Sequence, residues 1–471
     1  MRDKRKWAIL LLGAACFIRL VVWAAGTAQP DRLLAPDSAD YLRLAEGLAD
    51  HGVYGSEANP EIFRVPGYPF FLSLLFVLGR SPAFICLIQV VVDVATCWLL
   101  WRLARDVLDL EAALPALFFQ AFSVLAITYA CRVLSESLFT FLFVVLLHFI
   151  WRSVRSPVPR NGRRSSAREQ GSAEGDEAPE HSPGAVTSYH PDMGAVCGIL
   201  LAAMVYVRAV ALPFAILPPA LLLGYKRRRG AAVCAALVLV LLAPWYLRNL
   251  NRAGYPHFST VGAINLYRYN AAMVIARQED GSFVAVQKAM DAKLGERRDQ
   301  ADRARFALER GRGIIMAHPL LYAGLHLKTV PTNLLPAAGE LFRTLGVQIG
   351  RSGTLRVIRT EGILEGIRHY FGGKWGWFVA ALPMLPVLLA SYMLAVVGAF
   401  ERLLRGEARA FHAFLILAVG LFLLVPGGAA HPRFRLPVTP IFSLYAGWGA
   451  WWLWHLWKNH RSALRPSRAE S

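Results

Sequence analysis

Two carboxylates and an arginine near the start of the chain are the residue types most suited to chemistry. Asp37 and Asp40 lie in Pro-Asp-Ser-Ala-Asp-Tyr, which ends at Tyr41, and Arg64 opens the later motif Arg-Val-Pro-Gly-Tyr-Pro. A carboxylate can act as a general base that takes a proton from a hydroxyl or amine as that group attacks a sugar carbon. An arginine can bind phosphate through its planar donor fork, and the stiff turn after Arg64 could aim it.

The same residues have structural explanations. An aspartate that follows proline and precedes a helical pattern is a favoured N-cap, and Asp40 would then lie near the positive end of that helix. Capping and catalysis can also coincide at Asp37, because a cap fixes the position of the carboxylate. Arg64 could instead extend from an apolar surface to the membrane interface.

Other polar residues lie at the expected ends of apolar segments. A charge inside a membrane costs about 2.5–3.5 kcal/mol on insertion scales, so such residues tend to line polar cavities. Arg132 and Glu136 could equally pair with each other, since their spacing is one helical turn. Asn249 and Asn265 could bind sugar hydroxyls. The candidate substrate-binding residues are Tyr41, Arg64, Tyr68, Arg132, Glu136, Arg208, Arg248, Asn249, Asn265, His431, Arg433 and Arg435.

The elements that must position these residues are apolar. The chain has 471 residues, 55% of them hydrophobic, with a mean hydropathy of +0.40. Roughly 20 apolar residues cross a bilayer, and about ten segments approach that length. They lie near residues 7–28, 82–101, 112–130, 134–151, 193–207, 209–224, 231–247, 377–400, 410–425 and 437–457. The predicted fold is therefore an all-α polytopic membrane protein.

Charge gives this bundle an orientation. The formal net charge is +19, and basic clusters follow alternate apolar segments. The positive-inside rule then places both termini in the cytoplasm. By the resulting topology residues 29–81 and 248–376 fall outside, although the second stretch is itself basic and too long for the rule to apply. Clusters at membrane edges indicate lipid headgroups and insertion topology rather than nucleic acid. Arg433 and Arg435 lie on the outer side against this trend, which favours a contact with phosphate.

Two charges inside apolar segments need a separate explanation. Arg19 lies late in the first segment, where a structural or snorkelling role is expected, and Asp93 is the main acidic residue inside a segment. The 6 cysteines all lie in or beside apolar segments. We therefore expect no structural disulfide and no cysteine-based metal site.

The hydrophilic regions divide the predicted membrane domain, which covers residues 1–457. In the first outer loop, 29–81, helical spacing predicts a short helix from Asp37 that lies on the membrane. Residues 153–192 are rich in Ser, Gly, Pro, Glu and Arg and are expected to form a disordered cytoplasmic linker. In the large outer region, 248–376, a solvated helix is expected over 285–313 and an amphipathic one over 318–335. Residues 458–471 form a basic cytoplasmic tail.

The order of five motifs resembles a known family. They are Pro-Asp-x-x-x-Tyr, Arg-x-Pro-Gly-Tyr-Pro, Ser-Glu-Ser-Leu-Phe, Pro-Trp-x-x-Arg-Asn and His-Pro-Arg-Phe-Arg-Leu-Pro-x-x-Pro. Together they resemble the polytopic GT-C glycosyltransferases, nearest to the dolichyl-phosphate-mannose protein mannosyltransferase-like and lipid A aminoarabinose transferase-like branches. The resemblance extends from about residue 7 to about residue 450, outside the linker. It implies a GT-C-like bundle of about ten transmembrane helices, with interfacial helices in the first outer loop.

The resemblance also implies roles. Asp37 matches the catalytic aspartate, and the candidates for the donor phosphate are Arg64, Arg248, Arg433 and Arg435. Many relatives carry a second acidic residue directly after the catalytic one, where this chain has Ser38. Whether Asp40 shares the catalytic role therefore stays open, and the case for a divalent metal is weakened, so no cofactor is predicted.

The predicted function is that of an inverting glycosyltransferase acting on a hexosyl or pentosyl polyprenyl-phosphate donor. It would work on the outer face of the plasma (inner) membrane, with a glycan, lipid or protein as acceptor. The alternative is a non-catalytic transporter or flippase of lipid-linked sugars, which would use the same arginines to move a phosphate headgroup. The chain has no nucleotide-binding fingerprint, which argues against an ATP-driven transporter.

Overall fold

The computed structural model describes residues 2–56, 60–155, 193–350, 354–406 and 408–463, and that part of the chain is helical without a strand. Most of the predicted linker, residues 156–192, lies outside the described residues. Its first three positions belong to helix α7, which runs from Glu136 to Arg155.

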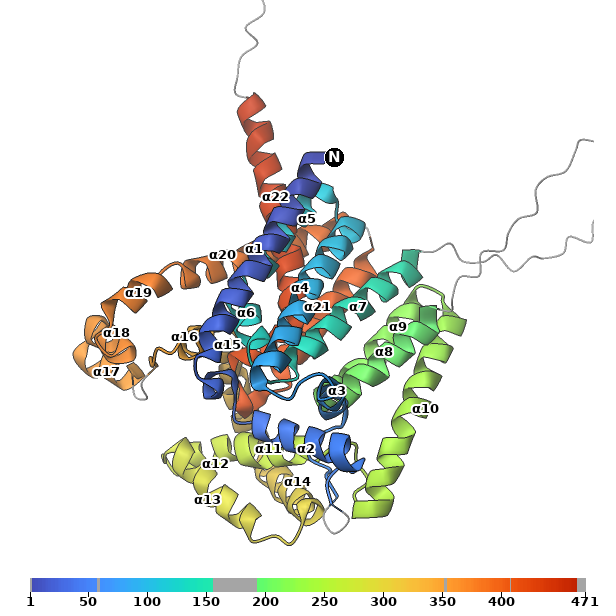
Figure 1. The fold of residues 1–471 in the computed structure, drawn as a ribbon, viewed down its shortest axis with the longest axis vertical. Helices are drawn as coiled ribbons and strands as arrows, with labels where there is room; N and C mark the ends of the chain where they lie inside the picture. The colour runs from blue at the N-terminus through green and yellow to red at the C-terminus, as the bar shows by residue number, and fades with distance from the viewer. Residues whose placement is uncertain (1, 57–59, 156–192, 351–353, 407, 464–471) are drawn as a thin grey trace, which may run out of the picture.

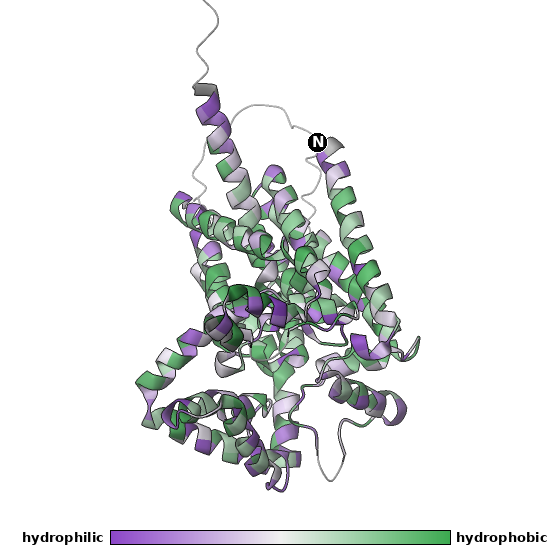
Figure 2. Cartoon of the chain, turned by 90° about the vertical axis from the view of Figure 1, so that its left-hand side faces the viewer, coloured by the Kyte–Doolittle hydropathy of each residue, from purple (hydrophilic) through white to green (hydrophobic). Residues whose placement is uncertain are grey.

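Long helices form a bundle, and the first and last helices of the chain have their outer ends on the same side of it (Figure 1). The N-terminus and the last turns of α22 lie at one end of the bundle, and α2 lies with α11–α14 at the other. Hydrophobic residues run along the bundle, while hydrophilic ones gather toward its ends (Figure 2). The bundle consists of α1 (Arg2–Thr27), α4 (Pro82–Val107), α5 (Leu110–Ala121), α6 (Val124–Ala130), α7 (Glu136–Arg155), α8 (Met193–Val207), α9 (Leu217–Gly224), α10 (Arg228–Ala253), α20 (Met384–Arg405), α21 (Arg409–Leu424) and α22 (Thr439–Ala463).

Shorter helices cover the end away from the termini and the flank of the bundle. The α-helices among them are α2 (Ser38–His51), α3 (Gly67–Leu75), α11 (Val261–Asn265), α12 (Ala272–Gln278), α13 (Phe283–Gly295), α14 (Gln300–Ala317), α15 (Pro319–Leu334), α16 (Ala338–Thr344), α17 (Thr354–Glu361), α18 (Ile363–Phe371) and α19 (Trp375–Ala381). Short 3₁₀ turns are η1 (Pro30–Leu33), η2 (Ala209–Ala211), η3 (Pro213–Ile216), η5 (Gly427–Ala429) and η6 (Pro432–Val438), and η4 (Leu266–Ala271) is a π-helix.

Five helices among the described residues are long and apolar enough to cross a membrane. They are Lys4–Thr27, Pro82–Val107, Glu136–Arg155, Arg228–Ala253 and Trp375–Arg405. The bent pair α5 and α6 would make a sixth, and three further apolar helices are shorter. The described part of the chain is thus all-helical and has the apolar helices of a membrane protein, while the expected count of about ten spans is not confirmed.

The segment predicted as one span at 112–130 is broken into α5 and α6, which meet at 54°. Ser123 explains the new start, because its Oγ accepts the backbone N–H of Ala126 at 3.4 Å. Arg19 explains the end of α5, because its Nη1 donates to the carbonyl of Ala121 at 2.8 Å. A cation at a helix C-terminus satisfies free carbonyls and complements the helix dipole.

Arg19 also pairs with Asp93 inside the bundle. Nε of Arg19 lies 2.5 Å from Oδ2 of Asp93, and the two side chains are 0% and 2% exposed. The structural role expected for Arg19 is confirmed. The cost of burying each charge is offset by the other and by the carbonyls that Arg19 contacts.

Helices α20 and α22 pack with almost no space between their backbones. A Cβ atom on Gly398 would overlap the carbonyl oxygen of Tyr445, and one on Gly449 would overlap that of Leu394. Small residues allow this approach, which is a common means of packing membrane helices. The contact fixes α22 and hence η6, the turn directly before it.

Within residues 248–376, one predicted helix is divided in two. The helix expected over 285–313 is two helices, α13 and α14, because Asp299 starts a new helix by accepting the N–H of Asp302 at 2.8 Å. The amphipathic helix expected over 318–335 matches α15. At the C-terminus, α22 continues through Ala463 into the predicted tail.

Candidate active site

The carboxylate of Asp37 lies between two guanidinium groups. Its Oδ1 accepts a hydrogen bond from Nη2 of Arg64 at 2.8 Å, and its Oδ2 accepts one from Nη1 of Arg433 at 2.8 Å. Arg64 also donates to Oδ2 of Asp40, from Nε at 3.2 Å and from Nη2 at 3.1 Å. Four side chains from α2, the loop before α3 and η6 thus form one ion-pair cluster.

Asp37 does not cap helix α2. It occupies the N-cap position, but its backbone is helical, with φ −76° and ψ −16°, and its side chain makes no capping hydrogen bond. The capping explanation of Asp37 is therefore wrong, because both of its oxygens bind arginines instead. Ser38 fixes the start of α2: its Oγ accepts the N–H of Ala35 at 2.9 Å and donates to the carbonyl of Val133 at 2.7 Å.

The two arginines keep Asp37 ionised. Burial alone would raise the pKa of Asp37, but the charges of Arg433 and Arg64 lower it to about 2. Burial lowers the pKa of Arg433, yet Glu136 and Asp37 together raise it above its usual value. The side chains of Asp37, Arg64 and Arg433 are 23%, 15% and 26% exposed. The cluster is thus a charged site that a ligand can reach.

Glu136 forms a second ion pair behind Arg433. Its Oε1 lies 2.5 Å from Nη1 of Arg208, and its side chain is 2% exposed. The expected pairing with Arg132 is wrong, since Nη2 of Arg132 lies 2.8 Å from Oε2 of Glu340. Helical spacing does not apply to Arg132, which lies between α6 and α7, outside either helix.

Arg248 and Asn249 bind backbone carbonyls rather than contacting Asp37. Arg248 donates to the carbonyls of Glu61 at 2.6 Å and Tyr54 at 3.1 Å, and Asn249 donates to the carbonyls of His257 and Phe258, both at 3.1 Å. The contacts of Arg248 fasten the end of α10 to the loop that carries Arg64, and those of Asn249 hold the residues that follow α10. The structure therefore does not bring Arg248 into the ion-pair cluster.

His431 and Arg435 flank Arg433 in different ways. The ring Nδ1 of His431 accepts the N–H of Arg433 at 3.2 Å and so starts η6. Arg435 is 3% exposed and donates to the hydroxyl of Tyr392. His431 thus positions the backbone of Arg433, and Arg435 points to another side of the turn. Asn265, at the end of α11, uses its carbonyl to accept from Nδ2 of Asn270 at 3.3 Å.

Two tyrosines form the wall beside Arg64. The rings of Tyr41 and Tyr68 meet edge to face with centroids 4.8 Å apart, and the guanidinium of Arg64 lies 5.0 Å from the centre of the Tyr41 ring. The hydroxyl of Tyr68 donates to Oε1 of Gln89 at 2.6 Å. The tyrosines restrict where the guanidinium can lie.

Glu61 is a positioning residue that the sequence analysis missed. Its Oε1 accepts the backbone N–H groups of Phe63 and Arg64, both at 2.8 Å. Its position three residues before Arg64, in front of the proline-glycine turn, is a weak signal that could have indicated it. Asn333, which accepts the N–H of His431 at 3.0 Å, has no such signal.

One cavity borders the ion-pair cluster at Asp40, and another borders Arg435, two residues after Arg433. The cavity at Asp40 has a volume of about 380 Å³, extends toward α13 and α14, and is lined by charged and apolar side chains. A narrow cavity of about 60 Å³ borders Arg435, lies between the α5–α6 break and helices α20 and α22, and is mainly apolar. No group of three or more His, Cys, Asp or Glu side chains that could hold a metal occurs in the described part of the chain.

No protein-family model and no curated protein matches the sequence. Among solved structures, the archaeal oligosaccharyltransferase AglB from Archaeoglobus fulgidus, in complex with an inhibitory peptide and a dolichol-phosphate, is similar at a TM-score of 0.50 and 15% identity. The alignment covers 99% of this chain and 53% of that one. The same oligosaccharyltransferase tethered with an acceptor peptide gives a TM-score of 0.51 at 14% identity, over 97% and 51% of the two chains.

The chain has a GT-C fold. The chain spans about half the length of the oligosaccharyltransferase chains that it matches. ArnT from Cupriavidus metallidurans, bound to undecaprenyl phosphate, matches over 94% of this chain and 78% of that one, at 15% identity and a TM-score of 0.40. That score is too low to add to the fold assignment.

Proposed function

We propose that the chain is an integral-membrane inverting glycosyltransferase that moves a sugar from a polyprenyl-phosphate donor to an acceptor. The observation that carries the proposal is the placement of Asp37 between Arg64 and Arg433, each at 2.8 Å. Transfer from a lipid phosphate needs a base for the acceptor and positive charge for the leaving group. In this cluster the carboxylate that can act as the base lies within hydrogen-bond distance of two positive charges.

The reaction is a single displacement. The acceptor O–H or N–H gives its proton to Asp37 while its heavy atom forms a bond to the anomeric carbon of the sugar. The bond from that carbon to the phosphate oxygen breaks on the opposite face, and its electron pair leaves with the polyprenyl phosphate. The configuration inverts, and the guanidinium groups of Arg433 and Arg64 stabilise the charge that develops on the phosphate.

The two guanidinium groups hold the carboxylate of Asp37 in a weakly basic form. A carboxylate with a pKa of about 2 has little tendency to accept a proton at neutral pH. A donor phosphate would compete for the same two guanidinium groups. As they turn toward the phosphate, the pKa of Asp37 rises toward its ordinary value, since fewer positive charges act on it alone. Donor binding would thus activate the base.

The two neighbouring cavities fit the two substrates. The narrow cavity beside Arg435 is bordered by Phe122, Leu388 and Phe442, a lining that suits part of a polyprenyl chain. The lining of the cavity beside Asp40 includes Arg43, Asp291 and further hydrogen-bonding groups, which suit an acceptor that carries hydroxyl or amine groups. In this arrangement the sugar lies between them, at Asp37.

The direction of the helices supports the outer side of the membrane. Helix α2, which begins directly after Asp37, lies at the end of the bundle opposite both the N-terminus and the end of α22 (Figure 1). Since the basic clusters favour cytoplasmic termini, we place the reaction on the outer face of the plasma membrane. A flippase could use a charge pair inside the membrane, such as Arg19–Asp93. Here Arg19 binds Asp93 and the carbonyl of Ala121, and these contacts hold helices of the bundle together.

The purified chain in proteoliposomes tests the proposal. Vesicles would carry polyprenyl-phosphate sugars labelled in the sugar and would receive a cell-envelope extract as the source of acceptor. We expect release of polyprenyl phosphate together with a labelled product whose anomeric configuration, read by NMR, is inverted. Movement of labelled lipid across the bilayer without any release of polyprenyl phosphate would instead indicate the flippase.

A further inference from the structure

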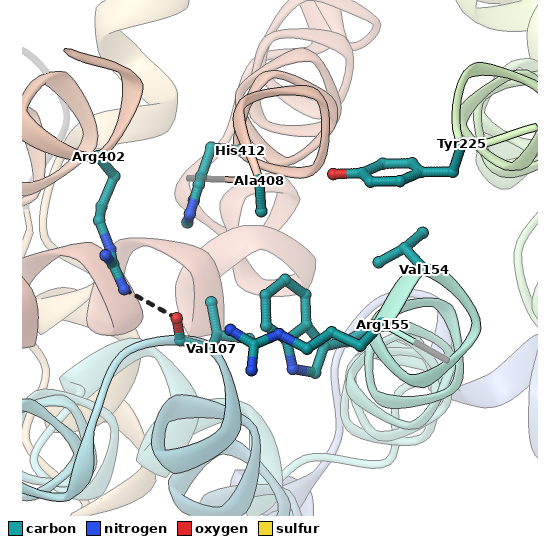
Figure 3. A pocket seen from close by; sticks show the side chains of 8 residues that line it. Val107, Val154, Arg155, Tyr225, Arg402, Ala408 and His412 are labelled. Atoms are coloured by element: carbon teal, nitrogen blue, oxygen red, sulfur yellow. Dashed lines mark hydrogen bonds between the residues drawn. The ribbon is translucent and has the colours of Figure 1, made fainter. Parts of the chain in front are cut away.

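A further cavity lies at the end of α7 that is remote from the Asp37 cluster (Figure 3). Its volume is about 520 Å³. Glu136, at the start of α7, adjoins the Asp37 cluster, whereas Val154, near the end of α7, lines the cavity. At about 1.5 Å per residue the two lie about 27 Å apart, close to the thickness of a bilayer core. Because α7 is one of the five candidate spans, the cavity lies at the opposite membrane surface.

The lining of this cavity combines basic, aromatic and aliphatic side chains. It is formed by Val107, Trp151, Val154, Arg155, Tyr225, Arg402, Ala408 and His412. Arg402 is 4% exposed and donates from Nη2 to the carbonyl of Val107 at 2.8 Å (Figure 3). Arg155 lies 4.8 Å above the ring of Trp151. Two guanidinium groups, an imidazole and a phenol therefore border one cavity.

The start of helix α21 adds a second source of positive potential. Ala408 and His412, which line the cavity, flank the first turn of this 16-residue helix, and the N-cap residue Ala408 makes no side-chain capping hydrogen bond. The hydroxyl of Tyr225 lies beside the backbone of Phe411 in the same turn. The free N–H groups at a helix start favour an anion. The buried Arg402 comes from a different helix, α20, so the two features are independent of each other.

We propose that this cavity binds a phosphate group, presented by an anionic lipid of that membrane surface. Basic pockets between membrane helices suit anionic headgroups, and the apolar lining residues, among them Trp151 and Val154, suit the glycerol and upper acyl carbons. The ligand would join α7, α20 and α21, which otherwise meet here around an open cavity. This site is separate from the Asp37 cluster and takes no part in sugar transfer.

Lipid titration of the purified full chain tests this site. The chain would be held in phosphatidylcholine nanodiscs and titrated with short-chain phosphatidic acid, with the thermal unfolding midpoint as the readout. We expect the midpoint to rise, and the apparent affinity to fall about tenfold in Arg155→Gln, which loses one charge-assisted contact. Arg102→Gln is the matched control, since Arg102 lies on α4 over Trp98, 4.9 Å from its ring centre and outside the lining.

Two further arms make the result decisive. Tyr225→Phe removes one hydroxyl from the lining and should also weaken binding, so the test does not depend on one variant. Inorganic phosphate that stabilises the chain through Arg155 as well as the lipid does would support the site and identify a soluble anion as its ligand. Equal affinity in Arg155→Gln, Tyr225→Phe and the unmodified chain would overturn the proposal. Loss of the effect in Arg433→Gln alone would overturn it too, by placing the phosphate at the Asp37 cluster.

Discussion

Replacing Asp37 by asparagine is the most direct perturbation of the ion-pair cluster. Asparagine keeps the shape of the side chain but removes the charge that lies 2.8 Å from both Arg64 and Arg433. Because Asp37 makes no capping bond, the helix start held by Ser38 should persist. We expect the variant to fold and to lose transfer activity about 10²- to 10⁴-fold, the usual contribution of a general base.

The structure also sets the stability cost of this change. The pKa of Asp37 is lowered from 3.8 to about 2, which corresponds to about 2.5 kcal/mol at about 1.4 kcal/mol per pKa unit. A lowered carboxyl pKa contributes stability that is present above the unfolded pKa, about 3.9, and is lost as the pH falls through the folded one. The unmodified chain should therefore exceed Asp37→Asn in unfolding free energy by the largest amount near neutral pH. This difference should decrease between about pH 4 and pH 2.

Two assays in the same detergent preparation measure these effects. Activity is followed as release of polyprenyl phosphate from labelled donor, and stability as the thermal unfolding midpoint over a pH series. Asp50→Asn is the matched control, because Asp50 lies on the same helix and binds Arg80 through both carboxylate oxygens, at 2.8 Å and 2.5 Å. That pair is exposed and lies away from the cluster, so its loss should leave activity unchanged.

One outcome would refute the reasoning outright. If folded Asp37→Asn transfers sugar at a rate within tenfold of the unmodified chain, Asp37 is not the base. A variant without activity whose stability is also unchanged at neutral pH would keep the base but contradict the strength assigned to the two ion pairs. Asp40→Asn separates the two carboxylates: Asp40 contacts Arg64 alone, so we expect a smaller loss.

Three further changes test other contacts. Arg433→Lys keeps the charge but loses the planar fork, so the KM for donor should rise about tenfold in steady-state kinetics while kcat falls less. Arg19→Met should destabilise the chain by about 3–5 kcal/mol through the unpaired charge left on Asp93, and adding Asp93→Leu should restore much of the unfolding midpoint. Gly398→Ala should lower that midpoint because its Cβ would overlap the carbonyl oxygen of Tyr445; an unchanged midpoint would show that α20 and α22 have room to separate.

The local sequence pattern was enough to predict several elements of the fold. Apolar runs of sufficient length indicated helices that could cross a membrane, since length and hydropathy belong to the segment itself. The helical spacing after Asp37 predicted α2, and the amphipathic pattern over 318–335 predicted α15. The α5–α6 break escaped prediction, because it depends on Arg19 reaching the carbonyl of Ala121 from another helix.

By itself the sequence determined which residue types were available for the site, and the tertiary structure decided which of them meet. Asp37, Arg64 and Arg433 were all candidates, but only the fold brings Arg433 to Asp37 across 396 positions. The same freedom explains the errors at Glu136 and Arg132. A buried charge takes whichever counter-charge the packing places within reach, and that choice depends on distances between helices, which residue spacing along the chain does not contain.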